Sequence, residues 1–349
     1  MEYTKEEIIT SNNFARNSDV VFSEFIDNRE FKKLKNIDDK VILNISNGLT
    51  TYFTKKFSIK NGDIIFCKTE FIHILFKKLN ENKKNVPNNL ILISSQSDIK
   101  IDKKLFKQKP KCISKWFSIN VSHDDADLIP IPLGLPETRN TKNIIYEDFS
   151  YLRLKFEKKT EKIFSNFNLN TRYFHRYKYA KTGLDNTDFI IQKANSNYID
   201  YLNSLSKYKY TLCPWGNGYD THRLWESLYS KSIPITTGHT AFKNFKDLPI
   251  IFINDYEQIN LEYLRKYTFN NLNLEKLNIN WWINLIASNK KESDNKIYEL
   301  QFRESEIEKI INKYNSIFKL SIFLKKLYTF CRRCHIKIFG RKLNKFIGM

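Results

Sequence analysis

Two series of short apolar runs alternate with segments of helical period along the chain. A continuous apolar run of about 4 to 8 residues is typical of a strand that is buried on both faces. The first series predicts strands at 41–46, 63–68, 90–95 and 128–135, with a helix over 70–80. The second series predicts strands at 162–169, 188–193, 210–214, 233–237 and 249–254, with helices over 198–208 and 221–231. Strands that alternate with helices form covered parallel sheets, so we expect an α/β fold with two Rossmann-like domains.

The change from the first series to the second sets the expected domain boundary. A highly charged stretch at 146–162 has helical character and predicts an interdomain connection. We therefore expect an N-terminal domain over 1–155, a second domain over 156–312 and a basic tail over 313–349. The segment 256–312 is charged and aromatic and is expected to be helical.

Composition narrows the class of protein. Of the 349 residues, 41% are hydrophobic and 15% aromatic, which is typical of a globular chain. There is no apolar run of about 18 residues and no basic start followed by an apolar segment, so we expect a cytoplasmic protein. The five cysteines are an odd number and mostly scattered, which argues against a disulfide framework.

The net charge of +20 is concentrated at the C-terminus. Residues 313–349 hold ten Lys and Arg and no Asp or Glu, and these alternate with Phe, Ile and Leu. Such a basic amphipathic segment favours an anionic membrane surface, so we expect a peripheral location at the inner face of the cytoplasmic membrane. Two alternatives stay open: the tail binds nucleic acid, which we favour less, or it packs on the N-terminal domain.

A glycine-rich turn stands out in a chain with only nine glycines. Gly216, Asn217 and Gly218 follow the strand predicted at 210–214, and the helix predicted over 221–231 comes next. In a parallel sheet this turn lies at the carboxyl end of a strand, where ligands bind. Glycine permits positive φ and lets a ligand approach the backbone, and the N–H groups of a helix start favour an anion such as a diphosphate.

The start of this helix carries the candidate ligands. Asp220 or Thr221 is expected to cap it, and His222 lies at its first turn. Helical spacing predicts that Arg223 and Glu226 lie on the face opposite the apolar one. Arg223 would bind a phosphate and Glu226 a ribose or sugar hydroxyl. A Gly-x-Gly turn is common, however, and an Arg–Glu pair at this spacing is usually a solvated surface pair, so the spacing alone does not name a ligand.

The stretch 207–236, KYKYTLCPWGNGYDTHRLWESLYSKSIPIT, resembles the donor site of exostosin-like glycosyltransferases. Three other stretches resemble segments of that family in the same order. They are NVSHDDADLIPIPLGL at 120–135, FSNFNLNTRYFHR at 164–176 and KDLPIIFINDYEQI at 246–259. The resemblance covers about residues 85–260.

The resemblance implies a GT-B fold, in which two Rossmann-like domains face a central cleft. It implies transfer from a nucleotide-sugar to a glycan or lipid-linked acceptor, as in surface polysaccharide or lipopolysaccharide synthesis. It also implies inversion at the anomeric carbon and no metal or other cofactor. Asn168 and Arg176 would face the donor phosphates, and Thr236 and Thr237 would end a strand over the same pocket. Position 234 is Pro, so the paired glutamates of many retaining relatives are absent, which favours inversion.

An inverting transfer needs a base that deprotonates the acceptor hydroxyl. His123 and Asp125 are the candidates, because they lie in the polar segment SHDDADL of the first domain. The alternative is that this segment is a polar turn before a strand. Asp125 and Asp127 match the Asp-x-Asp pattern of metal-dependent enzymes, but they precede an apolar strand, so no metal site is expected.

Other interpretations stay open. A fucosyltransferase-like enzyme of the same fold would also place a helix and a strand like 233–237 at its donor site. A non-catalytic protein that binds membranes or nucleic acid is the alternative of another class. The pattern Cys331-x-x-Cys334-His335 matches a haem attachment site. Haem attachment would require export, and zinc would require about four ligands, so we expect a thiol pair there.

Overall fold

The computed structural model describes residues 3–138, 144–152, 159–183, 186–192, 197–254, 256, 259–269, 272–291 and 296–339. Side chains are not described at 150–152, 318, 321, 322, 325, 326 and 328–339. The chain divides into two compact units. Unit 1 comprises Met1–Thr138, His239–Asn244 and Leu274–Tyr314. Unit 2 comprises Arg139–Gly238, Phe245–Asn273 and Asn315–Met349.

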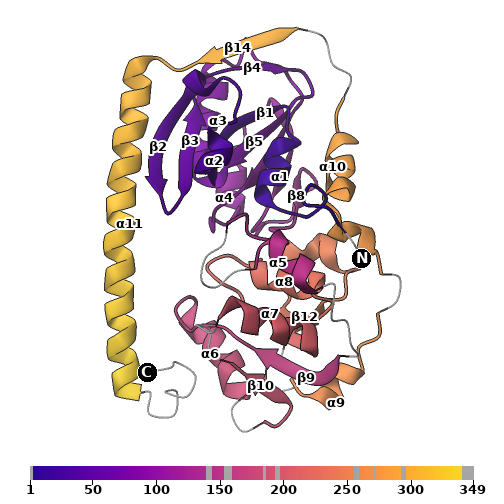
Figure 1. Cartoon of the computed structure of the whole chain (residues 1–349). Coiled ribbons are helices and arrows are strands. Elements are labelled where there is room, and N and C mark those ends of the chain that lie inside the picture. The colour runs from indigo at the N-terminus through magenta and orange to yellow at the C-terminus, as the bar shows by residue number, and fades with distance from the viewer. Residues whose placement is uncertain are drawn as a thin grey trace. The chain divides into compact units, whose positions relative to one another are not determined.

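A seven-stranded sheet of order β2-β3-β1-β5-β6-β7-β8 forms the centre of unit 1 (Figure 1). Strands β1, β5, β6, β7 and β8 are parallel, whereas β3 pairs antiparallel with β1 and β2. Its strands are β1 (Val20–Asp27), β2 (Lys40–Ser46), β3 (Leu49–Thr54), β5 (Ile64–Lys68), β6 (Leu90–Ser95), β7 (Ile113–Ser118) and β8 (Leu128–Pro130). The helices of this unit are α1 (Ser11–Arg16), α2 (Asn28–Phe31), η1 (Ile37–Asp39), η2 (Thr69–Phe71), α3 (Ile72–Glu81), α4 (Lys103–Phe106), η4 (Leu274–Leu277) and α10 (Ile279–Ala287).

A second part of unit 1 comes from late in the sequence. Strand β14 (Ile297–Gln301) pairs antiparallel with β4 (Lys56–Lys60), as Figure 1 shows. Leu300 and Phe302 are buried in the same apolar cluster as β1 and β3. The helix α11 (Glu304–Phe339) begins here, and Ile307, Ile310, Ile311 and Tyr314 of its first turns pack against that cluster. Residues 274–314 thus belong to the unit built from the start of the chain.

A five-stranded parallel sheet of order β10-β9-β11-β12-β13 forms the centre of unit 2. Its strands are β9 (Thr160–Ser165), β10 (Phe189–Ile191), β11 (Tyr208–Leu212), β12 (Ile233–Thr237) and β13 (Ile251–Ile253). The helices are α5 (Tyr146–Leu152), α6 (Tyr173–Thr182), α7 (Tyr198–Lys207), α8 (His222–Tyr229) and α9 (Leu261–Arg265). The 3-10 helix η3 (Thr240–Phe245) follows β12 in the sequence, and all but its last residue belong to unit 1. The buried faces of these strands are rich in Ile, Phe and Tyr.

The α/β class expected from the alternation is confirmed, with one mostly parallel and one parallel sheet, and this is compatible with two Rossmann-like domains. The contact-based units differ from the sequence-based boundaries at 155 and 312, because 274–314 joins unit 1. The segment 256–312 was expected to be helical, but it also contains β14, whose partner β4 lies more than 200 positions earlier. Only part of the helix expected at 146–162 forms: α5 ends at Leu152, residues 153–158 lie outside the described residues, and β9 begins at Thr160.

The late strand β14 supplies a buried side chain to unit 1, which predicts a large effect of its truncation. Leu300 is 1% exposed, whereas Ile297 on the same strand is 56% exposed. We expect Leu300→Ala to lower the unfolding free energy of unit 1 by about 2 to 4 kcal/mol, because it leaves a cavity. Ile297→Ala, the control, should change it by about 0.5 kcal/mol or less. Urea denaturation followed by hydrogen exchange of β5 and β6 checks this. Equal effects of the two substitutions would contradict it.

Candidate functional site

The candidate site lies where the sheet of unit 2 changes direction. Strand β9 has β10 on one side and β11 on the other, so the connections after β9 and β11 leave in opposite directions. Open parallel sheets bind ligands in the crevice outside such a switch point, at the carboxyl ends of the strands. The predicted donor residues all lie at this edge. Asn168 and Arg176 follow β9, residues 216–226 follow β11, and Thr236 and Thr237 end β12.

Arg176 joins the two loops of the switch point. Its side chain is buried, with the residue 8% exposed. Nε donates to the carbonyl oxygen of Trp215 at 2.8 Å, and Nη1 donates to the carbonyl oxygen of Asn168 at 2.7 Å. Arg176 was predicted to face the donor phosphates. In the structure its donors hold the loop after β9 to the loop after β11, and its charge stays beside the turn.

Gly216 lies against this arginine. A Cβ at Gly216 would lie 3.5 Å from Nη2 of Arg176 and 3.5 Å from Cγ2 of Thr221, and its φ is outside the left-handed region. The positive φ anticipated for this glycine is therefore not adopted. Both distances are ordinary van der Waals contacts, so the fold itself leaves room for an alanine at this position.

A second arginine, Arg172, was not predicted. It adopts left-handed backbone angles, φ 41° and ψ 51°, immediately before α6. Its Nη2 donates to the carbonyl oxygen of Asn217 at 3.1 Å, and its guanidinium carbon lies 4.6 Å from the centre of the Tyr219 ring. Arginine rarely adopts this conformation, and backbone strain of this kind concentrates at ligand sites.

An aromatic wall borders the turn. The His175 ring stacks on Trp215 with centres 4.6 Å apart and planes 10° apart. Trp215 Nε1 donates to the carbonyl oxygen of Thr237 at 3.1 Å. The hydroxyl of Thr237 lies 2.8 Å from the Tyr179 hydroxyl and 3.3 Å from His175 Nε2, while Thr236 is buried. Thr237 thus connects Trp215, Tyr179 and His175.

Arg223 presents an unpartnered donor at the start of α8. Its Nε is buried and has no hydrogen-bond partner among the described residues. Its guanidinium carbon lies 5.7 Å from the centre of the Tyr201 ring. Buried donors in proteins are nearly always satisfied, so this atom fits a group that a ligand would supply. This is the position that the sequence assigned to a donor phosphate.

Glu226 lies deeper than expected. The residue is 2% exposed, and its two oxygens accept from the Tyr201 hydroxyl at 2.7 Å and from the backbone N–H of Ile144 at 3.1 Å. Burial raises the pKa of its carboxyl, and the nearby Arg223 charge acts in the opposite direction. The alternative of a solvated Arg–Glu surface pair does not hold for Glu226, because α8 is buried on that side as well. The predicted contact of Glu226 with a ribose or sugar hydroxyl stays a prediction. Glu226 holds the Tyr201 side chain on which Arg223 rests.

The first residues of the helix are organised without a side-chain cap. Thr221 is the N-cap residue but its side chain makes no capping hydrogen bond. Asp220, also proposed as a cap, is buried, and both its oxygens accept from Trp225 Nε1 at 2.9 Å. His222 begins α8 and is half-buried, beside Arg223.

Three buried polar atoms without a hydrogen-bond partner in the described chain follow the two strands of the switch point. They are Thr171 Oγ1, His175 Nδ1 and Arg223 Nε. Arg172, Arg176 and Arg223 supply positive charge at the same edge, and neither Arg172 nor Arg223 forms an ion pair with an acidic side chain among the described residues. Arginine forks suit phosphate oxygens. The arrangement can therefore bind an anion and place an aromatic ring beside it.

The two candidate bases lie in unit 1. The His123 ring lies 5.6 Å from the Phe106 ring. Asp125 accepts from the N–H of Asp127 at 2.9 Å, in an exposed turn that leads into β8. That turn lies at the amino end of β8, whereas α/β sheets bind substrates at carboxyl ends. The geometry is that of a polar turn, so a catalytic role for His123 or Asp125 stays a prediction.

One buried carboxylate of unit 1 was missed in the sequence. Glu24 lies within β1, is fully buried and forms an ion pair with Arg16. Burial raises its pKa to about 8, and its Oε1 has no hydrogen-bond partner among the described residues. Because the side chain has no exposed surface, we assign it to the core of unit 1. Only its burial distinguishes it from a surface glutamate.

The environment of His175 predicts an unusually low pKa for its imidazole ring. Burial, and then the charges of Arg172, Arg176 and Lys178, lower its pKa from 6.5 to about 4. Between these pH values the folded chain binds fewer protons than the unfolded chain. The contribution of His175 to the free energy of unfolding is therefore present above pH 6.5 and lost as the pH falls toward about 4. We expect NMR titration to show a neutral ring at pH 6, and Arg172→Ala to raise the pKa. A ring that titrates near 6.5 would contradict this.

Comparison with known proteins adds no family to this description. No protein-family model matches the chain, and no curated protein matches it. In the described part of the chain, no group of three or more His, Cys, Asp or Glu side chains could hold a metal ion. No described helix is both long and apolar enough to cross a membrane. The side chains of Cys331, Cys334 and His335 lie outside the described ones.

Proposed function

We propose that unit 2 binds a nucleotide-sugar through its diphosphate and that the chain is a glycosyltransferase of GT-B type. The proposal rests on one observation. Arg172, Arg176 and Arg223 lie at one switch point, together with three buried polar atoms that have no hydrogen-bond partner among the described residues. A diphosphate would supply negative charge to Arg172 and Arg223 and hydrogen-bond partners to the three unpartnered atoms. The resemblance of the surrounding motifs to exostosin-like enzymes supports the same ligand class.

In this proposal the residues divide by role. Arg223 contacts the diphosphate and stabilises the charge that develops on it as the sugar leaves, with help from the N-terminus of α8. Arg172 supplies a second positive charge over Tyr219, and the Trp215–His175 stack offers a flat surface to a base or sugar ring. Arg176 and Glu226 act as positioning residues, because their donors and acceptors are engaged within the protein.

The rest of the mechanism follows the family expectation. With charge stabilised by arginines, no metal is required at the diphosphate, and the transfer is proposed to invert the anomeric carbon. Unit 1 is proposed to receive the acceptor, a glycan or lipid-linked precursor of a surface polysaccharide. His123 and Asp125 stay the candidate bases from sequence, although the turn that holds Asp125 favours a structural role.

The exposed part of α11 supports membrane association. Ile317, Leu320, Phe323, Leu324 and Leu327 are 47 to 62% exposed and recur at intervals of three or four residues, so they share one side of the helix. Lys319, Lys325 and Lys326 lie among them in the sequence. The charge favours an anionic lipid surface as the occupant, and the apolar side chains would insert between headgroups. The first turns of α11, as far as Tyr314, pack on unit 1, but they precede nearly all of the basic tail at 313–349.

Substitution of Arg223 tests the donor site. In buffer with chelator, we expect one of UDP, GDP, CDP or CMP, or a sugar conjugate of it, to raise the melting temperature of the wild type by several degrees. A nucleotide concentration of about one hundred times Kd raises the free energy of unfolding by about 2.7 kcal/mol. Arg223→Ala should abolish the shift. Arg265→Ala removes an exposed arginine of the same unit and should retain it.

The outcome discriminates between classes of protein. No stabilisation by any nucleotide, or an unchanged shift in Arg223→Ala, would favour the non-catalytic binding protein over a glycosyltransferase. A shift that is retained by Arg265→Ala but lost in Arg223→Ala would identify the nucleotide. A fucosyltransferase-like enzyme would be distinguished by a preference for a guanine nucleotide.

The α11 face predicts lipid-dependent sedimentation. We expect the full chain to sediment with phosphatidylglycerol vesicles and to stay in solution with pure phosphatidylcholine. Leu320→Ser with Leu324→Ser should reduce binding by about tenfold, because two apolar side chains no longer insert. Ile42→Ser with Ile45→Ser alters two exposed apolar side chains of β2 and serves as control. Equal losses in both double variants, or equal binding to both vesicles, would contradict the proposal.

A further inference from the structure

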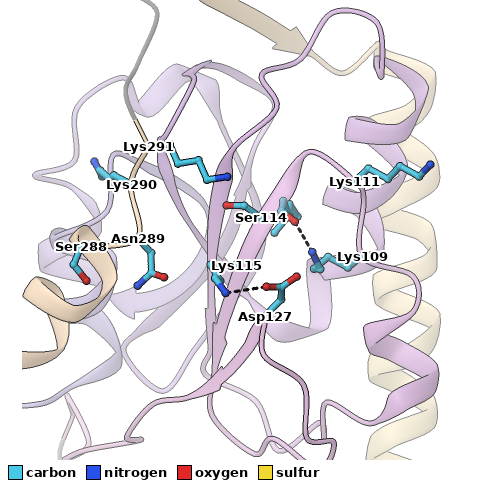
Figure 2. Close-up of a pocket in the computed structure, with 10 residues that line it drawn as sticks. Lys109, Lys111, Ser114, Lys115, Asp127, Ser288, Asn289, Lys290 and Lys291 are labelled. Atoms are coloured by element: carbon cyan, nitrogen blue, oxygen red, sulfur yellow. Dashed lines mark hydrogen bonds and ion pairs between the residues drawn. The ribbon is translucent and has the colours of Figure 1, made fainter.

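A pocket of about 600 Å³ lies in unit 1, away from the carboxyl ends of its strands. It is lined by the loop before β7, by the residue before β8 and by the segment after α10, as Figure 2 shows. These positions are at the amino edge of the parallel sheet. Substrate sites of α/β sheets lie at the opposite edge. The pocket is thus separate from any site at those carboxyl ends, and its volume is in the range of small-molecule sites.

Lysines dominate the lining. Five of the lining residues are lysines, and one is acidic: Lys109, Lys111, Lys115, Lys290, Lys291 and Asp127. Figure 2 shows Lys109, Lys115 and Lys291 reaching toward the middle, with Lys111 and Lys290 at the two sides. The formal charge of the lining is 5 − 1 = +4. A concave surface with one sign of charge concentrates oppositely charged ligands.

Existing ion pairs neutralise only part of this charge. Lys115 pairs with Asp127 at 2.8 Å, and Lys290 pairs with Asp19 at 2.7 Å. Lys109 donates to the carbonyl oxygen of Ile113, and burial lowers the pKa of its ammonium group. Lys111 and Lys291 form no ion pair with another described residue. Three of the five ammonium groups, those of Lys109, Lys111 and Lys291, therefore have no acidic partner at ion-pair distance in the described chain.

The other polar side chains of the pocket are already occupied. The Ser114 hydroxyl donates to the carbonyl oxygen of Leu90 at 3.1 Å. The Ser288 hydroxyl and the Asn289 amide both donate to the carbonyl oxygen of Leu285 at 2.8 Å. A sugar or other neutral polar ligand would need such groups for recognition. The donors that remain are ammonium groups, which favour a highly charged anion.

We propose that this pocket binds a soluble small molecule that carries two or more linked phosphates. Lysine ammonium groups act on phosphates as mobile point charges, and linked phosphates supply several negative charges within a few ångströms. A single carboxylate would compensate only one of the three unpaired ammonium groups. This site does not depend on the proposed donor site, which uses arginines of unit 2.

Lysine labelling with an amine-reactive acetylating reagent, read by mass spectrometry, tests the site residue by residue. The probe is inorganic tripolyphosphate at fixed ionic strength. We expect saturable protection of Lys109, Lys115 and Lys291, and no protection of Lys32 and Lys35, which are exposed beyond the carboxyl end of β1. Binding of the probe to the arginines of unit 2 does not affect this readout.

Two substitutions of opposite sign sharpen the test. Asp127→Asn removes the one acidic lining residue and should lower the half-protecting concentration by about 3- to 10-fold, whereas Lys291→Gln should raise it by a similar factor. Asp38→Asn and Lys35→Gln are the controls, because they make the same charge changes on the surface of unit 1. They should change the half-protecting concentration of tripolyphosphate by about twofold or less.

Three results would overturn the proposal. One is protection that does not saturate or that is equal at Lys32 and Lys35. Another is an effect of Asp38→Asn as large as that of Asp127→Asn, since only overall charge would then matter. The third is protection by a short DNA duplex at a lower phosphate concentration than tripolyphosphate, which would assign the surface to nucleic acid.

Discussion

The buried guanidinium of Arg176 joins the two loops at which the sheet of unit 2 reverses its direction of winding. Connections that leave β9 and β11 in opposite directions open a crevice between them, and nothing in the strands themselves closes it. Arg176 holds the crevice at a fixed width, because it donates to one carbonyl on each side. Arg176 therefore fixes the loop that contains Asn168 to the loop that contains Trp215 and the glycine turn.

The polar groups around this link are arranged in two layers. In the inner layer, Glu226 accepts from Tyr201 and from the backbone, and Asp220 accepts from the Trp225 indole, so both carboxylates are bonded to residues on or beside α8. In the outer layer, Arg223 and His175 each keep a buried nitrogen without a partner in the described chain. A buried polar atom costs free energy when it is unsatisfied, so such atoms persist where a ligand completes them. The inner layer therefore stabilises the fold, and the outer layer is where the proposed diphosphate would bind.

Local patterns in the sequence were sufficient for all five strands of the second sheet, for β2, β5, β6 and β8 of the first, and for the position of the glycine turn, but β3, β4 and β7 were missed. Runs such as 90–95 and 233–237 begin with consecutive apolar residues, as expected of strands in a covered parallel sheet. Strand β1 was missed, since Ser23 and Glu24 interrupt its apolar run although both are buried. Strand β14 was missed because its stability comes from pairing with β4, which no local pattern records.

The same limit applies to the site. Helical spacing placed Arg223 correctly at the turn, but it could not show that α8 is covered on the side of Glu226. Arg172 and His175 lie in a segment without periodic signal, and their role depends on Trp215 and Asn217, some 40 positions later. Contacts between loops that are distant in sequence arise from the strand order, so they appear only once the fold is known.

Hydrogen exchange of the full chain, with and without a nucleoside diphosphate in chelating buffer, tests whether the diphosphate binds at the switch point of unit 2. If the switch point of unit 2 binds the diphosphate, exchange should slow in residues 166–176 and 213–223 and stay unchanged in β5 and β6 of unit 1. Slowing of both loops by one nucleotide would place the donor where the arginines gather. Unchanged exchange in these loops with every nucleotide, or slowing confined to unit 1, would contradict the account.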